Sequence, residues 1–172
     1  MQSTNFILIQ SIGFVALLLF ALSFQLKTKQ KILGVQVFSF LFWSLHYALL
    51  GAWTGMALTL LNSLRVFIFY KYRGRPQWLL YIFLFLALLF TVITWEGYIS
   101  LFVLGGVFFA TISTFQEDEQ KLRHLFPPSN IMWIVYNLFV RSYSGILSEI
   151  IVLISIIVGI FRNKNTRGRC KI

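Results

Sequence analysis

The sequence predicts an all-α, polytopic membrane protein with seven transmembrane helices, and two observations lead to this prediction. The first is composition, since 58% of the residues are hydrophobic and 12% are charged, against about 45–50% and about 25% in soluble domains. The second is that long apolar runs alternate with short basic clusters. A helix rises about 1.5 Å per residue, so about 20 apolar residues cross a hydrocarbon core of roughly 30 Å. Most of the surface is therefore expected to face lipid.

Seven apolar runs are long enough, or can be extended, to serve as spans. They cover residues 6–26, 32–51, 54–70, 77–94, 98–115, 130–140 and 144–161. The sixth is short by itself, and we extend it back through 122–126, with Pro127 and Pro128 forcing a kink or an irregular turn. Six spans with one re-entrant segment is the alternative. No Lys or Arg precedes the first run and no small-residue cleavage site follows it, so it is expected to remain as a helix.

The basic residues predict the orientation, because Lys and Arg favour cytoplasmic loops. With the N-terminus outside, the segments 26–31, 71–76, 116–129 and 162–172 are cytoplasmic and hold nearly all Lys and Arg. The external turns hold only Arg141, and Arg65 lies within a span. This distribution in short clusters also argues against nucleic-acid binding, despite the net charge of +10. The single Cys170 excludes a disulfide framework and a multi-cysteine metal site, and no cofactor is expected.

An internal repeat appears when the sequence is shifted by 90 residues. Trp43 then pairs with Trp133, Thr54–Gly55 with Ser144–Gly145, and, after a one-residue adjustment, 23–25 with 114–116. The repeat divides a single membrane domain, 1–172, into a first three-helix unit (6–72), a linker helix (77–95), a second unit (97–162) and a basic tail (163–172). Corresponding spans are four crossings apart, so the units are parallel, one of the symmetries that recur in transporters.

Polar side chains inside the spans are the candidate binding site, because such groups in hydrocarbon are costly and need a partner or a function. Helix-rise arithmetic places several of them at similar depth below the external surface. The predicted substrate-binding residues are His46, Thr59, Asn62, Trp133, Tyr136, Asn137 and Glu149. Arg65 and Glu149 are predicted to form a gating or structural ion pair. A neutral hydrogen-bonded His46 and a purely structural Asn62 are the alternatives that compete with these roles.

The motifs His46–Gly51, Leu61–Arg65 and Trp133–Asn137, with Glu149 twelve residues on, resemble the YgjV-type family of bacterial inner-membrane proteins. The fold looks like that of the wider SWEET and PQ-loop superfamily, in which two three-helix bundles and a linker helix surround a solute path. The resemblance thus implies a multi-pass protein of the bacterial cytoplasmic membrane. The Pro-Gln motif of that superfamily is absent, and Gly105–Gly106 is an alternative source of flexibility.

Two functions follow as hypotheses, and neither is enzymatic, because the sequence lacks a phosphate-binding loop, a metalloprotease motif and a nucleophile elbow. The leading one is a small-solute transporter in which the two units rock against each other. The alternative is a membrane receptor or complex subunit that binds a protein or lipid without flux. The expected partners are the lipid bilayer and a small solute, with homo-oligomerisation left open.

Overall fold

The computed structural model describes residues 2–23, 26, 29–71, 76–116, 121 and 124–169, and side chains for 5–23, 26, 30–71, 76–116, 121 and 124–157. Within these residues the chain forms seven α-helices and no strands, which confirms the all-helical prediction. The helices are α1 (Gln2–Ser23), α2 (Lys29–Leu49), α3 (Trp53–Lys71), α4 (Gln77–Ile93), α5 (Ile99–Thr114), α7 (Pro127–Phe139) and α8 (Tyr143–Arg169). The basic side chains expected at 27, 29, 73, 75, 123 and in the tail lie outside the described ones.

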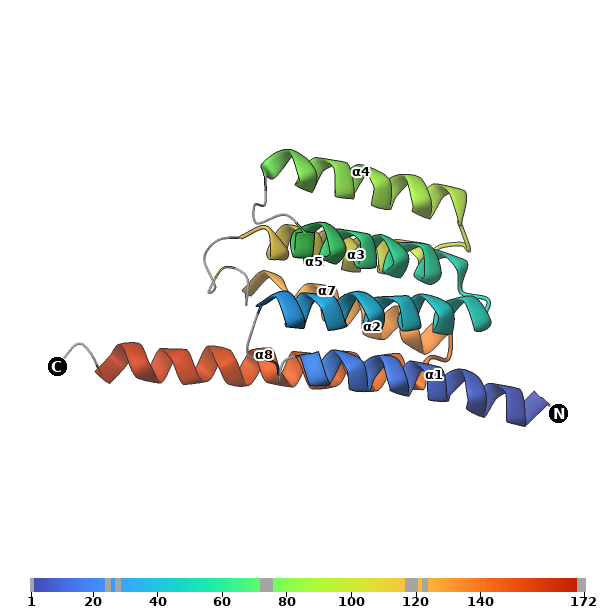
Figure 1. The fold of residues 1–172 in the computed structure, drawn as a ribbon, viewed down its shortest axis with the longest axis horizontal. Coiled ribbons are helices and arrows are strands. Elements are labelled where there is room, and N and C mark those ends of the chain that lie inside the picture. The colour runs from blue at the N-terminus through green and yellow to red at the C-terminus, as the bar shows by residue number, and fades with distance from the viewer. Residues whose placement is uncertain are drawn as a thin grey trace.

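Six of the helices form a closed ring, and α4 lies outside it. Going around the ring, α1 packs against α2, α2 against α3, α3 against α5, α5 against α7, α7 against α8, and α8 against α1. Helix α4 contacts only α3 and α5, and it forms the outermost layer opposite α1 and α8 (Figure 1). The helix axes are roughly parallel, with α1 beginning at one end and α8 ending at the other (Figure 1).

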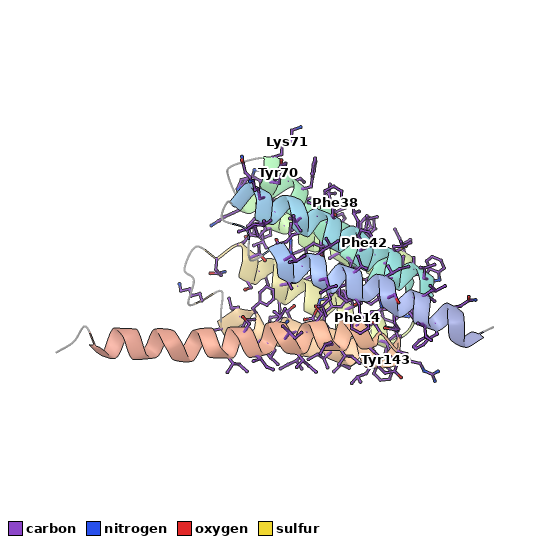
Figure 2. The ribbon with its side chains drawn as sticks, turned by 60° about the horizontal axis from the view of Figure 1, so that its bottom comes forward. Phe14, Phe38, Phe42, Tyr70, Lys71 and Tyr143 are labelled. Carbon is purple, nitrogen blue, oxygen red and sulfur yellow. The ribbon has the colours of Figure 1, made fainter. Side chains whose placement is uncertain are left out.

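The turns α2–α3 and α7–α8 have the same backbone hydrogen bonds at an offset of 90 residues. Ala52 N donates to Tyr47 O at 2.9 Å, and Ser142 N donates to Asn137 O at 2.9 Å. Each turn has a residue in the left-handed region, Gly51 with φ 74° and Arg141 with φ 57°. We call the end of the ring that holds both turns the Gly51 end, and the other the Lys71 end. Figure 2 shows Lys71 and Tyr143 toward opposite ends.

Helices α1 and α2 are hydrogen-bonded in the same way as α5 and α7. Ser39 Oγ on α2 donates to the carbonyl of Ala16 at 2.8 Å, and Ser129 Oγ on α7 donates to the carbonyl of Gly106 at 2.7 Å. Both bonds obey the 90-residue offset. The loops that follow α1 and α5 obey it too, because Leu26 N bonds Ser23 O and Gln116 N bonds Ser113 O. The one-residue adjustment expected from the sequence is therefore wrong at this point.

The sixth predicted span corresponds to α7, which begins at Pro127, and the described residues His124 and Leu125 before it are also helical. Phe126 forms a bend, and Pro127 and Pro128 occupy the first helical positions. Proline is tolerated there because the first amide groups of a helix have no intrahelical partner. The helix has 13 residues, about 20 Å at 1.5 Å per residue. The proposed extension at 122–123 lies outside the described residues.

The outer surface of the ring is strongly apolar. Large side chains point outward from several helices, including Phe14, Phe38 and Tyr143 (Figure 2). By length and hydropathy, Asn5–Ser23 and Gln30–Leu49 are able to cross a membrane, and Gln77–Ile93, Ile99–Thr114 and Tyr143–Ile157 are shorter apolar helices. Extended apolar surface of this kind is typical of contact with lipid or with another protein.

Candidate functional site: a polar cavity inside the helix ring

A cavity of about 100 Å³ lies inside the ring. All six ring helices contribute to its walls, whereas α4 contributes none. The lining residues are Phe20, Phe40, Trp43, Tyr47, Thr59, Asn62, Arg65, Ala110, Phe126, Ser129, Asn130, Trp133, Gly145, Ser148, Glu149 and Val152. The cavity is thus a property of the whole ring and not of a single pair of helices.

Many of the lining residues are related to one another by the 90-residue offset. The related pairs are Phe20 and Ala110, Phe40 and Asn130, Trp43 and Trp133, Thr59 and Glu149, and Asn62 and Val152. Equivalent positions of the two halves therefore face the same space, which lies at the centre of the arrangement. Only the tryptophans are chemically identical, so the walls are symmetric in position and asymmetric in chemistry.

The polar wall has one closely bonded pair, formed by Asn130 on α7 and Glu149 on α8. Asn130 Nδ2 donates to Glu149 Oε2 at 2.5 Å. The other end of the same amide, Asn130 Oδ1, has no hydrogen-bond partner within the described part of the chain, although Asn130 is only 1% exposed. Because the NH₂ group faces the carboxylate, the amide oxygen is turned away from it. A buried acceptor without a partner is uncommon and needs an explanation such as a bound water or ligand.

The polar residues of α3 are arranged differently. Thr59 Oγ1 donates to the carbonyl of Gly55 at 2.7 Å, within its own helix. Arg65 Nη1 donates to Thr111 Oγ1 at 2.5 Å, which joins α3 to α5. Asn62, 6% exposed, lies between these two along the helix. The predicted partners Arg65 and Glu149 thus both line the cavity, from α3 and α8. The Arg65 guanidinium bonds Thr111, and the Glu149 carboxylate bonds Asn130.

Five of the predicted site residues line the cavity, namely Thr59, Asn62, Arg65, Trp133 and Glu149, and three do not. His46 lies at the Gly51 end, where Nδ1 donates to the carbonyl of Ile9 at 2.8 Å and Nε2 is 2.8 Å from Ser142 Oγ. Tyr136 accepts a hydrogen bond from Gly55 N at 2.9 Å. These side chains, together with Asn137, point into helix contacts and do not line the cavity.

The predicted site lacks several cavity residues, among them Asn130 and Tyr47. Asn130 lies at the start of a predicted span, and Tyr47 follows His46. Comparing equivalent positions of the repeat could have identified both residues. Asn130 stands where the first half has the apolar Phe40, and Tyr47 stands opposite Asn137, so each position exchanges an aromatic residue for an amide.

Tyr47 is the lining residue of α2 that lies nearest the Gly51 end. Its ring stacks on Trp43, with centroids 6.0 Å apart, and on Trp133, with centroids 5.9 Å apart. Its hydroxyl donates to Asn137 Oδ1 at 2.7 Å, and the side chain is 3% exposed. Tyr47 and Asn137 are equivalent positions of the repeat, so this bond crosses the centre of the ring. We call Trp43, Tyr47, Trp133 and Asn137 the aromatic plug.

Further hydrogen bonds join the two halves at the same end. On one side of the ring, Gln10 on α1 accepts from Ser144 N on α8 at 3.2 Å and donates to the carbonyl of Arg141 at 2.9 Å. On the opposite side, the hydroxyls of Thr54 on α3 and Ser100 on α5 are 3.0 Å apart. Among the bonds of the described side chains, that of Arg65 with Thr111 joins the halves nearer the Lys71 end. Of these hydrogen bonds between described residues, most lie at the Gly51 end.

The Imp-YgjV family model, which describes a bacterial inner membrane protein, matches residues 7–167. The chain belongs to this family. Every residue that lines the cavity falls within the matched range. No curated protein and no solved structure matches the chain. Family membership places the protein in the bacterial inner membrane, as the sequence predicted.

Proposed function

We propose that this inner-membrane protein is a carrier for a small solute and works by alternating access. The observation that carries the proposal is a cavity lined by equivalent positions of two related groups of three helices, with Tyr47 and Asn137 bonded to each other beside it. In this proposal α1–α3 and α5, α7 and α8 are two parallel three-helix units, and α4 is the linker between them. Such an arrangement supports rocking of one unit against the other about a fixed site.

The proposed orientation places the Gly51 end outside and the Lys71 end in the cytoplasm. It rests on the basic residues of the sequence, which cluster in the segments at the Lys71 end and in the C-terminal segment. All seven long helices are then spans, with the N-terminus outside. With the aromatic plug on the external side, the structure represents a state closed to the outside. The resemblance to the SWEET and PQ-loop superfamily supports the same three-one-three organisation.

The cavity size limits the solute. A water position takes roughly 10–15 Å³ of such volume, so a cavity of about 100 Å³ has room for about seven to ten waters. A solute with about as many non-hydrogen atoms therefore fits without rearrangement. Glu149, Asn130, Asn62 and Thr59 are the proposed polar contacts, and Trp43 and Trp133 form the apolar wall.

Flux through the purified protein tests the proposal. Proteoliposomes are loaded with a pool of small polar metabolites, and the loss of each compound is followed by mass spectrometry against protein-free vesicles. At least one compound is expected to leave only when the protein is present, and Asn62→Ala and Glu149→Gln should slow that flux at least tenfold. Glu96→Gln is the control, because the Glu96 carboxylate bonds Trp53 N at 2.6 Å and does not line the cavity.

The outcome also separates a carrier from a receptor. If no compound moves while a protein partner co-purifies in stoichiometric amount, the receptor hypothesis replaces the carrier. If flux occurs but is the same in the Asn62 and Glu149 variants, the solute path lies elsewhere.

A further inference from the structure

We infer that the cavity recognises its solute through a primary ammonium group, which is received by Glu149 and by Asn130 Oδ1. Transport of such a ligand across the membrane rests on the proposed carrier function. Binding itself is a separate property and can be measured without flux.

The hydrogen-bonding geometry calls for a donor. Asn130 lines the cavity and donates one N–H to Glu149 Oε2 at 2.5 Å, and its buried Oδ1 has no hydrogen-bond partner among the described residues. A carboxylate has room for about four hydrogen bonds, of which Asn130 supplies one. The pair therefore offers several acceptor positions at one side of the cavity. An ammonium group carries three donors and a positive charge, so it satisfies the amide oxygen and the carboxylate together.

A flipped Asn130 amide would not serve. Its oxygen would then face the oxygen of Glu149 at the same short distance, which a carboxylate does not allow. With Glu149 ionised, the observed direction of the amide is the one that gives a hydrogen bond, and an ionised carboxylate inside a membrane needs a cationic or donating partner.

The rest of the wall indicates the body of the solute. Phe40, Trp43 and Trp133 line the same space, and Phe20 and Val152 lie nearer the Lys71 end. The Thr59 hydroxyl donates to carbonyls of its own helix. The other polar lining residues are Thr59, Asn62, Arg65, Ser129 and Ser148, and of these Thr59, Arg65 and Ser129 donate hydrogen bonds to groups of the protein itself. A small amine with an apolar or aromatic body matches the acceptor pair and the aromatic wall.

The repeat supports a single ammonium position. The residue equivalent to Glu149 is Thr59, and the residue equivalent to Asn130 is Phe40. The acceptor pair therefore exists in one half only. A solute that enters the symmetric cavity is oriented by this one pair.

A matched set of probes tests the inference. Binding to the full-length protein in lipid nanodiscs is measured by calorimetry for phenethylamine, 2-phenylethanol, 3-phenylpropanoate and phenylalanine, which share a ring and differ in charge. Phenethylamine is expected to bind, and the neutral and anionic probes to bind at least tenfold more weakly. Glu149→Gln and Asn130→Leu should each weaken phenethylamine binding at least tenfold, and Glu96→Gln should leave it unchanged.

The contrary results are equally clear. The inference is overturned if 2-phenylethanol binds as well as phenethylamine, if only the zwitterion phenylalanine binds, or if both cavity variants bind the amine normally. Asn130→Leu keeps the test decisive if Glu149→Gln does not fold. Amine binding that depends on Glu149 without any exchange across proteoliposomes would uphold the ligand class and refute the carrier. Flux without amine preference would do the reverse.

Discussion

Removing the hydroxyl of Tyr47 is the most direct perturbation of the proposed external closure. Tyr47→Phe keeps the ring between Trp43 and Trp133, so the stacking contacts at 6.0 and 5.9 Å are retained. It removes the 2.7 Å bond to Asn137 Oδ1, which joins equivalent positions of the two halves. The substitution therefore changes one bond across the centre of the ring and almost no packing.

The free energy that the closed state loses depends on the Asn137 amide, which the substitution leaves without its hydrogen-bond donor. Hydrogen bonds between helices in membranes contribute about 0.6 kcal/mol on average and up to about 1.7 kcal/mol. Asn137 Nδ2 already has no partner, and Asn137 is fully buried, so the variant leaves both amide atoms unsatisfied. An unsatisfied buried acceptor costs about 1–3 kcal/mol. We expect the closed state to lose about 1–2 kcal/mol, which changes its population relative to open states about 5–30-fold.

Thiol accessibility measures this change. Val152→Cys places a thiol of similar size in the cavity wall, in a Cys170→Ser background that has no other cysteine. In right-side-out vesicles, a membrane-impermeant maleimide added outside should label Cys at this site about 5–30-fold faster when Tyr47→Phe is present. Tyr81→Phe is the matched control, because it removes a hydroxyl from a side chain of α4 that is 68% exposed.

A double variant sharpens the result. Replacing Asn137 by Leu in the Tyr47→Phe background removes both partners, and apolar replacement of both is close to neutral. Labelling should then return to within about threefold of the parent. Equal labelling of the parent and Tyr47→Phe proteins, with normal folding, would refute the role of this bond in closure.

Two further predictions concern stability. Arg141 has φ 57° with its side chain exposed, so Arg141→Gly should stabilise the protein by about 0.5–1 kcal/mol. Gly51 has φ 74° in the equivalent turn, so Gly51→Arg should lower the thermal midpoint of unfolding. A lower thermal midpoint for Arg141→Gly would contradict the turn geometry. Gly106→Ala would place a methyl 2.8 Å from Trp133 Cδ1 and should cost about 1–3 kcal/mol. Gly34→Ala, whose nearest new contact is at 3.8 Å, should be neutral or stabilising, and equal effects at the two glycines would exclude close packing as the cause.

The helical fold could be predicted because each helix has its own apolar run. Boundaries at the Gly51 end agreed well with the sequence, since glycine and polar residues interrupt the runs there. The sixth helix was harder, because Pro127 and Pro128 are compatible with a kink inside a helix or with its first turn. The conformation of the residues before the prolines decides between these two arrangements. The structure places both prolines at the start of α7.

The site could be predicted in part, because depth along a helix follows from counting residues but direction around it does not follow from polarity alone. His46 and Glu149 were grouped by depth, yet His46 points at the carbonyl of Ile9 and at Ser142 while Glu149 points into the cavity. A polar side chain in a membrane seeks the nearest partner, and for His46 that partner is a backbone carbonyl. Which backbone carbonyl a side chain will bond cannot be predicted from residue types.

The repeat carries information that the individual motifs lack. Two equivalent positions that face the centre of the ring meet each other, so their residue types can be compared directly. The unlike pair Tyr47 and Asn137 provides a donor and an acceptor, and they bond at 2.7 Å. The same comparison at 40 and 130 gives Phe40 against Asn130, and at 59 and 149 gives Thr59 against Glu149. The duplicated helices thus supply a central space with equal geometry on both sides, and the differences between equivalent residues determine where that space is closed and where it binds.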